Sequence, residues 1–123
     1  MSGSAGSRAG ALGALFCALA VIAGAFGAHG LRGRLDAGHL ALWETAARYL
    51  MYGGLGILAA AAGRWRHGAP AAGLMAAGGA IFSGTVFALA LGGPRILGAV
   101  TPIGGVLLIA GFLTLAVGAL RTR

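Results

Sequence analysis

The chain has 123 residues, of which 59% are hydrophobic and only 9% are charged. A soluble domain carries about a quarter charged residues, so most of this surface is expected to face the lipid bilayer, and residues 1–123 to form one integral membrane domain. The net charge of +7 comes from arginines that lie between the apolar runs, where they meet anionic headgroups. Nucleic acid is excluded as a partner, because the sequence lacks a basic face with interleaved aromatic residues.

The first apolar run covers residues 9–29 and is long enough to cross the bilayer as a helix. A cleavable signal peptide is the alternative, because Ala23-Gly24-Ala25 resembles a small-residue cleavage site. The run is longer than a usual signal core, and the chain stays apolar after it. We therefore expect the segment to be retained as the first of four spans.

Residues 30–42 connect the first run to the second. Leu31, Leu35 and Leu42 fall on one side of this segment at helical spacing. Such a pattern is typical of a helix that lies along the membrane surface. It favours a short interfacial helix after the first span.

The second span is expected over residues 43–63. Trp43 and Trp65 lie 22 residues apart, which is about 33 Å along a helix and matches aromatic belts at the two interfaces. This span places Arg48 inside the membrane, one turn after Glu44. That acid-before-base order favours an ion pair along the helix.

The third span, residues 71–93, carries no charge, and we expect the other helices to pack around it. Small residues recur in it at every fourth position, which predicts a ridge that lets another backbone approach closely. A large side chain on this ridge, as in Gly84→Leu, is expected to disrupt helix packing. The ridge consists of Ala72, Ala76, Ala80, Gly84, Ala88 and Gly92.

The fourth span is expected over residues 96–120. Gly104, Gly111 and Gly118 recur in it at intervals of seven and form a second small-residue face, which could meet the ridge of the third span. The predicted fold class is therefore all-α, a four-helix transmembrane bundle.

The arginines predict the orientation of the chain. Five lie on the side of the termini and three on the other side, which favours both termini in the cytoplasm. Abundant Ala, Gly and Arg without Lys, Asn or Gln is typical of a GC-rich bacterial genome, so a multi-pass protein of the bacterial cytoplasmic (inner) membrane is expected. The first group is Arg8, Arg64, Arg66, Arg121 and Arg123, and the second is Arg32, Arg34 and Arg95.

Three ionisable residues are candidate functional groups. Arg48 with Glu44 is the strongest candidate, because an ionisable group within a span is a functional hypothesis by default. The alternative, which we favour, is an arginine that snorkels toward the headgroups near the end of its helix. His29 could relay protons or bind a ligand, but a histidine at a helix end is also stabilised there by the helix dipole, and we favour that role.

Three further candidates carry hydroxyl groups: Tyr49, Ser83 and Thr101. Tyr49 is expected to anchor the helix at the interface, and Ser83 and Thr101 to bond a helical carbonyl or bridge two helices. The three histidines are too scattered for a metal site, and no cofactor motif is present. No nucleophile stands beside a base and no span contains paired carboxylates, so no catalytic residue is expected and the protein is not predicted to be an enzyme.

Four short motifs in this chain occur together: Gly24–Leu31 (GAFGAHGL), Trp43–Tyr49 (WETAARY), Ile81–Gly84 (IFSG) and Thr101–Gly105 (TPIGG). In their order and spacing they resemble the domain of unknown function 423 family, the YgdD-like small membrane proteins. The resemblance implies a small four-span integral membrane protein and supplies neither a substrate nor a reaction. The chain departs from the family pattern at Leu50 and Gly53, where Gln and His are usual, and at Phe87 and Phe112, where Tyr and Trp are common.

Two classes of function fit this sequence. The first is a non-catalytic helical bundle with a structural, lipid-organising or partner-binding role, whose small-residue faces suit self-association or contact with another membrane protein. The second is a small transporter or channel that works as an oligomer. We favour the first class, because the first span lacks the acidic residue on which multidrug exporters of this size rely.

Overall fold

The computed structural model describes residues 3–122. Over these residues the chain forms four helices and no strand, so the all-α, four-helix prediction is confirmed. The helices are α1 (Gly3–His29), α2 (Ala37–Ala62), α3 (Gly68–Ala90) and α4 (Leu97–Arg121).

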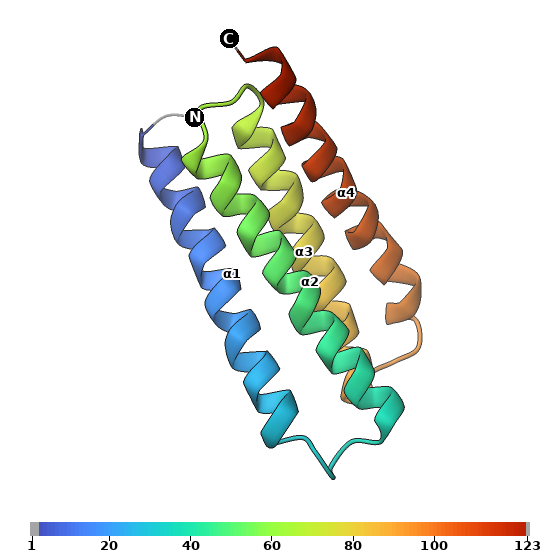
Figure 1. The fold of residues 1–123 in the computed structure, drawn as a ribbon. Coiled ribbons are helices and arrows are strands. Elements are labelled where there is room, and N and C mark those ends of the chain that lie inside the picture. Colours follow the sequence, from blue (N-terminus) through green and yellow to red (C-terminus); the bar gives the residue numbers. More distant parts are fainter. Residues whose placement is uncertain (1–2, 123) are drawn as a thin grey trace.

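The helices run alternately up and down, and each packs against the next one in the chain (Figure 1). Both α2 and α3 lie inside this arrangement, whereas α1 and α4 lie at its outer edges and, within the described residues, do not contact each other. Since α1 also touches α3 only slightly, a groove remains between them along α2. The central position expected of the third span is therefore shared by α2 and α3.

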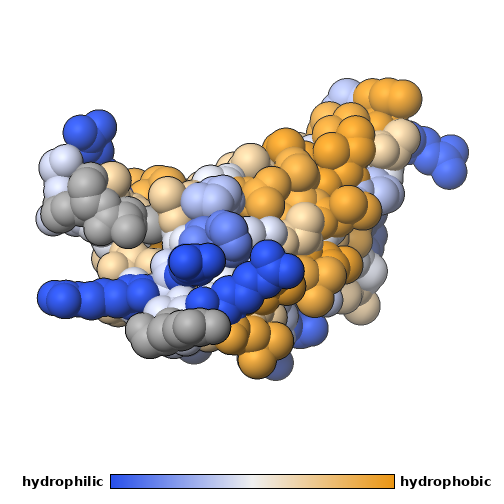
Figure 2. Space-filling view, turned by 90° about the horizontal axis from the view of Figure 1, so that it is seen from above, coloured by the Kyte–Doolittle hydropathy of each residue, from blue (hydrophilic) through white to orange (hydrophobic). Residues whose placement is uncertain are grey.

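Among the described residues, three helices, α1, α3 and α4, are long and apolar enough to cross a membrane. The remaining helix, α2, has 26 residues and lies between α1 and α3. The beginning of α1, the end of α4 and the α2–α3 connection lie at one end of the molecule (Figure 1). Figure 2 looks onto this end and shows hydrophilic side chains gathered over it and hydrophobic side chains along the flank, as expected of a protein that crosses a bilayer.

The predicted interfacial helix is wrong. Residues 30–36 form a tight turn in which Gly33 has a φ of 82° and Arg32 pairs with Leu35 in an isolated bridge. A positive φ ends helical geometry, and glycine adopts it without steric cost. Asp36 then caps α2, because its side chain accepts a hydrogen bond of 2.8 Å from the backbone N–H of His39. The chain therefore enters α2 at once, six residues before the predicted second span begins.

The Asp36 cap predicts a pH-dependent stability. Hydrogen bonds from the backbone N–H and the ring of His39 hold the pKa of the Asp36 carboxyl below its ordinary value. This pKa is lower in the folded state than in the unfolded state, so the charged cap stabilises the fold at pH values above the unfolded pKa of about 4. This contribution is lost as the pH falls through the folded pKa. We expect the thermal unfolding midpoint to fall between pH 7 and pH 3 by more in the wild type than in Asp36→Asn, which keeps an N-cap that does not titrate. Equal falls in the two proteins would show that the carboxylate charge plays no part.

The ridge predicted on α3 does not form one contact face. Positions four apart rotate by about 40° per step around a helix, so six of them wind around half of its circumference. A Cβ built on Gly84 meets no atom within 4 Å, and the prediction that Gly84→Leu disrupts packing is therefore wrong for contacts within the described chain. The ridge runs from buried Ala72 through partly buried Ala76 to exposed Ala80 and Gly84, then to partly buried Ala88 and exposed Gly92, which lies beyond the helix end.

Gly104, Gly111 and Gly118 lie on the buried side of α4. Positions seven apart rotate by only about 20° per step, so they stay on one face. A Cβ on Gly104 would come within 2.9 Å of the Gly78 carbonyl oxygen, and one on Gly111 within 3.0 Å of the Met75 nitrogen. At Gly118 the space is taken by the backbone of the α2–α3 connection. The helices α3 and α4 therefore approach at backbone distance, as small residues allow.

Candidate functional site

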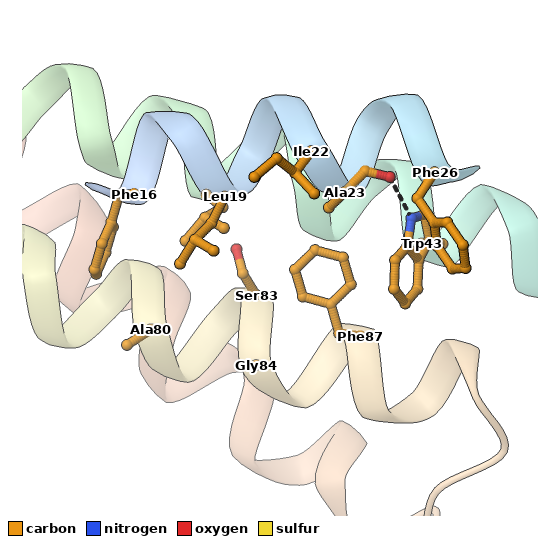
Figure 3. Close-up of a pocket in the computed structure, with 11 residues that line it drawn as sticks. Phe16, Leu19, Ile22, Ala23, Phe26, Trp43, Ala80, Ser83, Gly84 and Phe87 are labelled. Carbon is orange, nitrogen blue, oxygen red and sulfur yellow. Dashed lines mark hydrogen bonds between the residues drawn. The ribbon is translucent and has the colours of Figure 1, made fainter. Parts of the chain in front are cut away.

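A groove of about 530 Å³ opens between α1 and α3, with α2 as its floor (Figure 3). We call it the α1–α3 groove. Bulky side chains of α1 line one wall, and the small residues Ala80 and Gly84 on α3 leave room at the other. Its size suits a small ligand or part of a lipid. The lining residues are Phe16, Leu19, Ile22, Ala23, Phe26, Trp43, Leu50, Ala80, Ser83, Gly84 and Phe87.

Trp43 closes one end of the groove and links three helices. Its indole N–H donates a 2.7 Å hydrogen bond to the Ala23 carbonyl oxygen on α1. Its ring lies 4.6 Å from that of Phe87 on α3, edge to face, and 6.1 Å from that of Phe26 on α1. Gly27 makes this position available, because a Cβ there would come within 2.6 Å of the Trp43 ring.

Sequence reasoning missed the role of Trp43. The spacing of Trp43 and Trp65 predicts an anchor in the aromatic belt, where an indole N–H faces the headgroups, whereas in the structure this N–H donates to the Ala23 carbonyl oxygen within the protein. Gly27 was not singled out at all. The only signal was that Gly27 and Trp43 occur in two of the four motifs, and nothing in their spacing shows that the motifs touch.

Ser83 is the buried polar residue of the groove. It is 1% exposed, and within the described residues its Oγ has no hydrogen-bond partner. The Ser83 side chain points from α3 toward α1 (Figure 3). The predicted bond from Ser83 to a helical carbonyl is absent within the described residues, although the hydroxyls of Thr85 on α3 and Thr101 on α4 both lie within hydrogen-bond distance of such a carbonyl. This hydroxyl therefore carries an unused hydrogen-bonding capacity at the groove wall.

The hydroxyl of Thr101 takes its predicted bridging role. Its Oγ1 lies 2.6 Å from that of Thr85, so one hydroxyl donates to the other and links α4 to α3, while the accepting hydroxyl donates to a carbonyl of its own helix. Tyr49 is partly buried, and its ring lies 4.6 Å from that of Phe82. Tyr49 lines a second apolar groove, of about 430 Å³, between α2 and α4.

The charged candidates do not converge on either groove. Glu44 and Arg48 are both exposed, and the described residues show no ion pair between them. His29 is exposed at the last position of α1. Within the described part of the chain, no group of three His, Cys, Asp or Glu residues could hold a metal ion. Of the six candidates, only Ser83 lines the α1–α3 groove.

Comparison with known proteins gives the family of this chain. Its residues 23–105 match the family described as "Protein of unknown function (DUF423)". It is 48% identical over 113 residues to a UPF0382 membrane protein of Staphylococcus saprophyticus, covering 89% of this chain and 94% of the relative. It is 40% identical over 115 residues to the UPF0382 membrane protein YwdK of Bacillus subtilis, and this match covers 89% of this chain and 94% of the relative.

The relative from Bacillus subtilis thus shares most of its length with this chain. No solved structure matches the chain. The matched region contains all four motifs on which the resemblance rested, and three of them supply residues of the α1–α3 groove. The chain therefore belongs to the DUF423 family, whose curated relatives are named as bacterial membrane proteins.

Proposed function

We propose that this protein is a non-catalytic membrane protein that holds the hydrocarbon part of a lipid in the α1–α3 groove. The observation that carries this proposal is the lining of the groove, in which apolar side chains from three helices surround a single hydroxyl. The two walls of the groove, α1 and α3, are helices long and apolar enough to cross a membrane, so lipid is the ligand at highest local concentration. Its volume of about 530 Å³ is within the range of small-ligand sites.

We further propose that the chain lies in the bacterial inner membrane with both termini in the cytoplasm. Four arginines of the described chain lie at the end that carries the termini and three at the opposite end, and the positive-inside rule places the richer end in the cytoplasm. Arg123, which also supported this orientation, lies outside the described residues. The richer end has Arg8, Arg64, Arg66 and Arg121, and the other has Arg32, Arg34 and Arg95.

Filling the groove tests the proposed function. A leucine at position 84 would project from α3 into the groove without meeting another atom at its Cβ. We expect Gly84→Leu to keep wild-type stability and to lose the lipid that the wild type retains. The measurement is native mass spectrometry of the protein released from its own membrane in mild detergent.

The matched control is Gly73→Leu, on the same helix. Gly73 is also exposed with no atom within 4 Å of a built Cβ, but it does not line the groove. Equal lipid retention by the two variants would contradict the proposal. A defined oligomer without bound lipid would instead favour the transporter or channel.

A further inference from the structure

We infer that the occupant of the α1–α3 groove is a lipid-soluble molecule with a carbonyl oxygen on a planar ring and an apolar tail, a prenylated quinone by chemical class, and that Ser83 donates a hydrogen bond to this carbonyl. The inference rests on the proposed function and names the chemistry of its ligand. It starts from the hydroxyl of Ser83, which is buried and has no partner within the described residues.

A plain hydrocarbon chain would leave this hydroxyl unpaired. Buried hydroxyl groups in proteins almost always have a hydrogen-bond partner, because losing water without replacing its hydrogen bonds costs free energy. Thr85, two residues further along α3, satisfies its hydroxyl on the Ile81 carbonyl oxygen. Ser83 instead points across the groove toward α1 (Figure 3). An acceptor atom on the ligand completes the site.

The depth of Ser83 excludes the ester of a phospholipid as this acceptor. Ser83 lies seven residues before Ala90, the last residue of α3, or about 10 Å from that end of the helix. The connection that follows α3 carries Arg95, and arginines in connections lie at the level of the headgroups, where phospholipid esters also lie. The acceptor that reaches Ser83 must therefore belong to the apolar body of the ligand.

The shape of the groove suits a ring with a tail. Aromatic rings of Phe26, Trp43 and Phe87 gather at one end (Figure 3), and such rings favour stacked or edge-on contact with a planar ring. From Phe26 to Phe16 the wall of α1 extends about 15 Å, which is longer than one ring. The lining of this stretch on α1 is apolar, as a hydrocarbon tail requires.

Fluorescence of Trp43 tests the inference. The chain has two tryptophans, so Trp65→Phe leaves Trp43 as the only one, and Trp43→Phe leaves only Trp65 as the control for non-specific quenching. Both variants are placed in vesicles of saturated phosphatidylcholine and titrated with a decyl-tailed benzoquinone. We expect saturable quenching of Trp43 and only weak, linear quenching of Trp65.

Adding Ser83→Ala to the Trp65→Phe chain separates the hydrogen bond from the rest of the site. This change removes a hydroxyl that has no hydrogen-bond partner within the described residues, so the fold is retained. We expect the affinity for the quinone to fall by about two- to tenfold, as for the loss of one hydrogen bond. An unchanged affinity overturns the inference.

A titration with a phospholipid that has brominated acyl chains shows whether only the quinone inference fails or whether the proposed lipid binding fails as well. If the brominated lipid quenches Trp43 in a way that Gly84→Leu abolishes, while the quinone shows no dependence on Ser83, the groove binds plain acyl chains and only the present inference is wrong. If neither probe quenches Trp43 above the Trp65 control, the groove is not a lipid site and both proposals are overturned.

Discussion

Replacing Gly104 with alanine should destabilise the protein by about 1–3 kcal/mol, the usual cost of forcing extra volume into a packed interface. A Cβ at this position would lie within 2.9 Å of the Gly78 carbonyl oxygen and of the Phe82 Cα. These are backbone atoms, so no side chain can rotate away, and α3 and α4 must move apart. The shift would also stretch the 2.6 Å contact between Thr85 and Thr101. The measurement is the thermal unfolding midpoint in detergent.

The neighbouring glycine provides the control for this prediction. A Cβ on Gly105 meets only the ring of Phe82, at an ordinary contact distance of 3.7 Å. Alanine favours a helix over glycine by about 1 kcal/mol, so Gly105→Ala should unfold at the wild-type temperature or slightly above it. If Gly104→Ala were as stable as Gly105→Ala, the close approach of α3 and α4 would be wrong.

Trp43→Ala should be the most destabilising change where α1 packs against α2 and α3. It removes the hydrogen bond to the Ala23 carbonyl oxygen and the ring contacts with Phe26 and Phe87, which together join α1 to α2 and α3. Truncating a core aromatic residue costs about 3–5 kcal/mol, and we expect the lower part of this range because Trp43 is only partly buried. Unfolding in detergent, followed by circular dichroism, measures the change.

Trp43→Phe divides this effect into its two parts. It keeps an aromatic ring against Phe87 but loses the indole N–H and part of the ring volume, so we expect a cost above the roughly 0.5–1.5 kcal/mol of the hydrogen bond alone and below that of Trp43→Ala. Gly27→Ala should resemble Trp43→Ala instead, because a Cβ at Gly27 lies within 2.6 Å of the indole and displaces it. Similar stabilities of Gly27→Ala and Trp43→Phe would show that the indole adapts to the smaller space.

The turn between α1 and α2 shows where local sequence signals were sufficient and where they were misread. Asp36 and Gly33 are a helix cap and a positive-φ residue, and both roles follow from residue type. The spacing of three leucines nevertheless favoured a helix across the same residues. Capping and backbone conformation override such spacing, because a helix cannot continue through a residue with positive φ.

The ridge on α3 shows a second kind of error. A spacing of four residues does not keep side chains on one face, because a helix turns every 3.6 residues, and Gly84 therefore lies on the groove side instead of the α4 side. The spacing of seven on α4 drifts little, and Gly104, Gly111 and Gly118 all lie on its buried side. The drift around the helix axis, about 40° for positions four apart and about 20° for positions seven apart, distinguishes the winding ridge on α3 from the single face on α4.

Length, composition and local motifs were enough to predict the number of helices, their largely apolar character, the family and the arginine-rich connections. The rotation of each helix about its axis, which brings Trp43 against Gly27 and leaves Ser83 without a partner among the described residues, followed only from the packed structure. In a soluble helix, a polar face and an apolar face reveal this rotation. In a membrane helix the lipid is as apolar as the neighbouring helices, so both sides carry similar residues and only the packed contacts distinguish them.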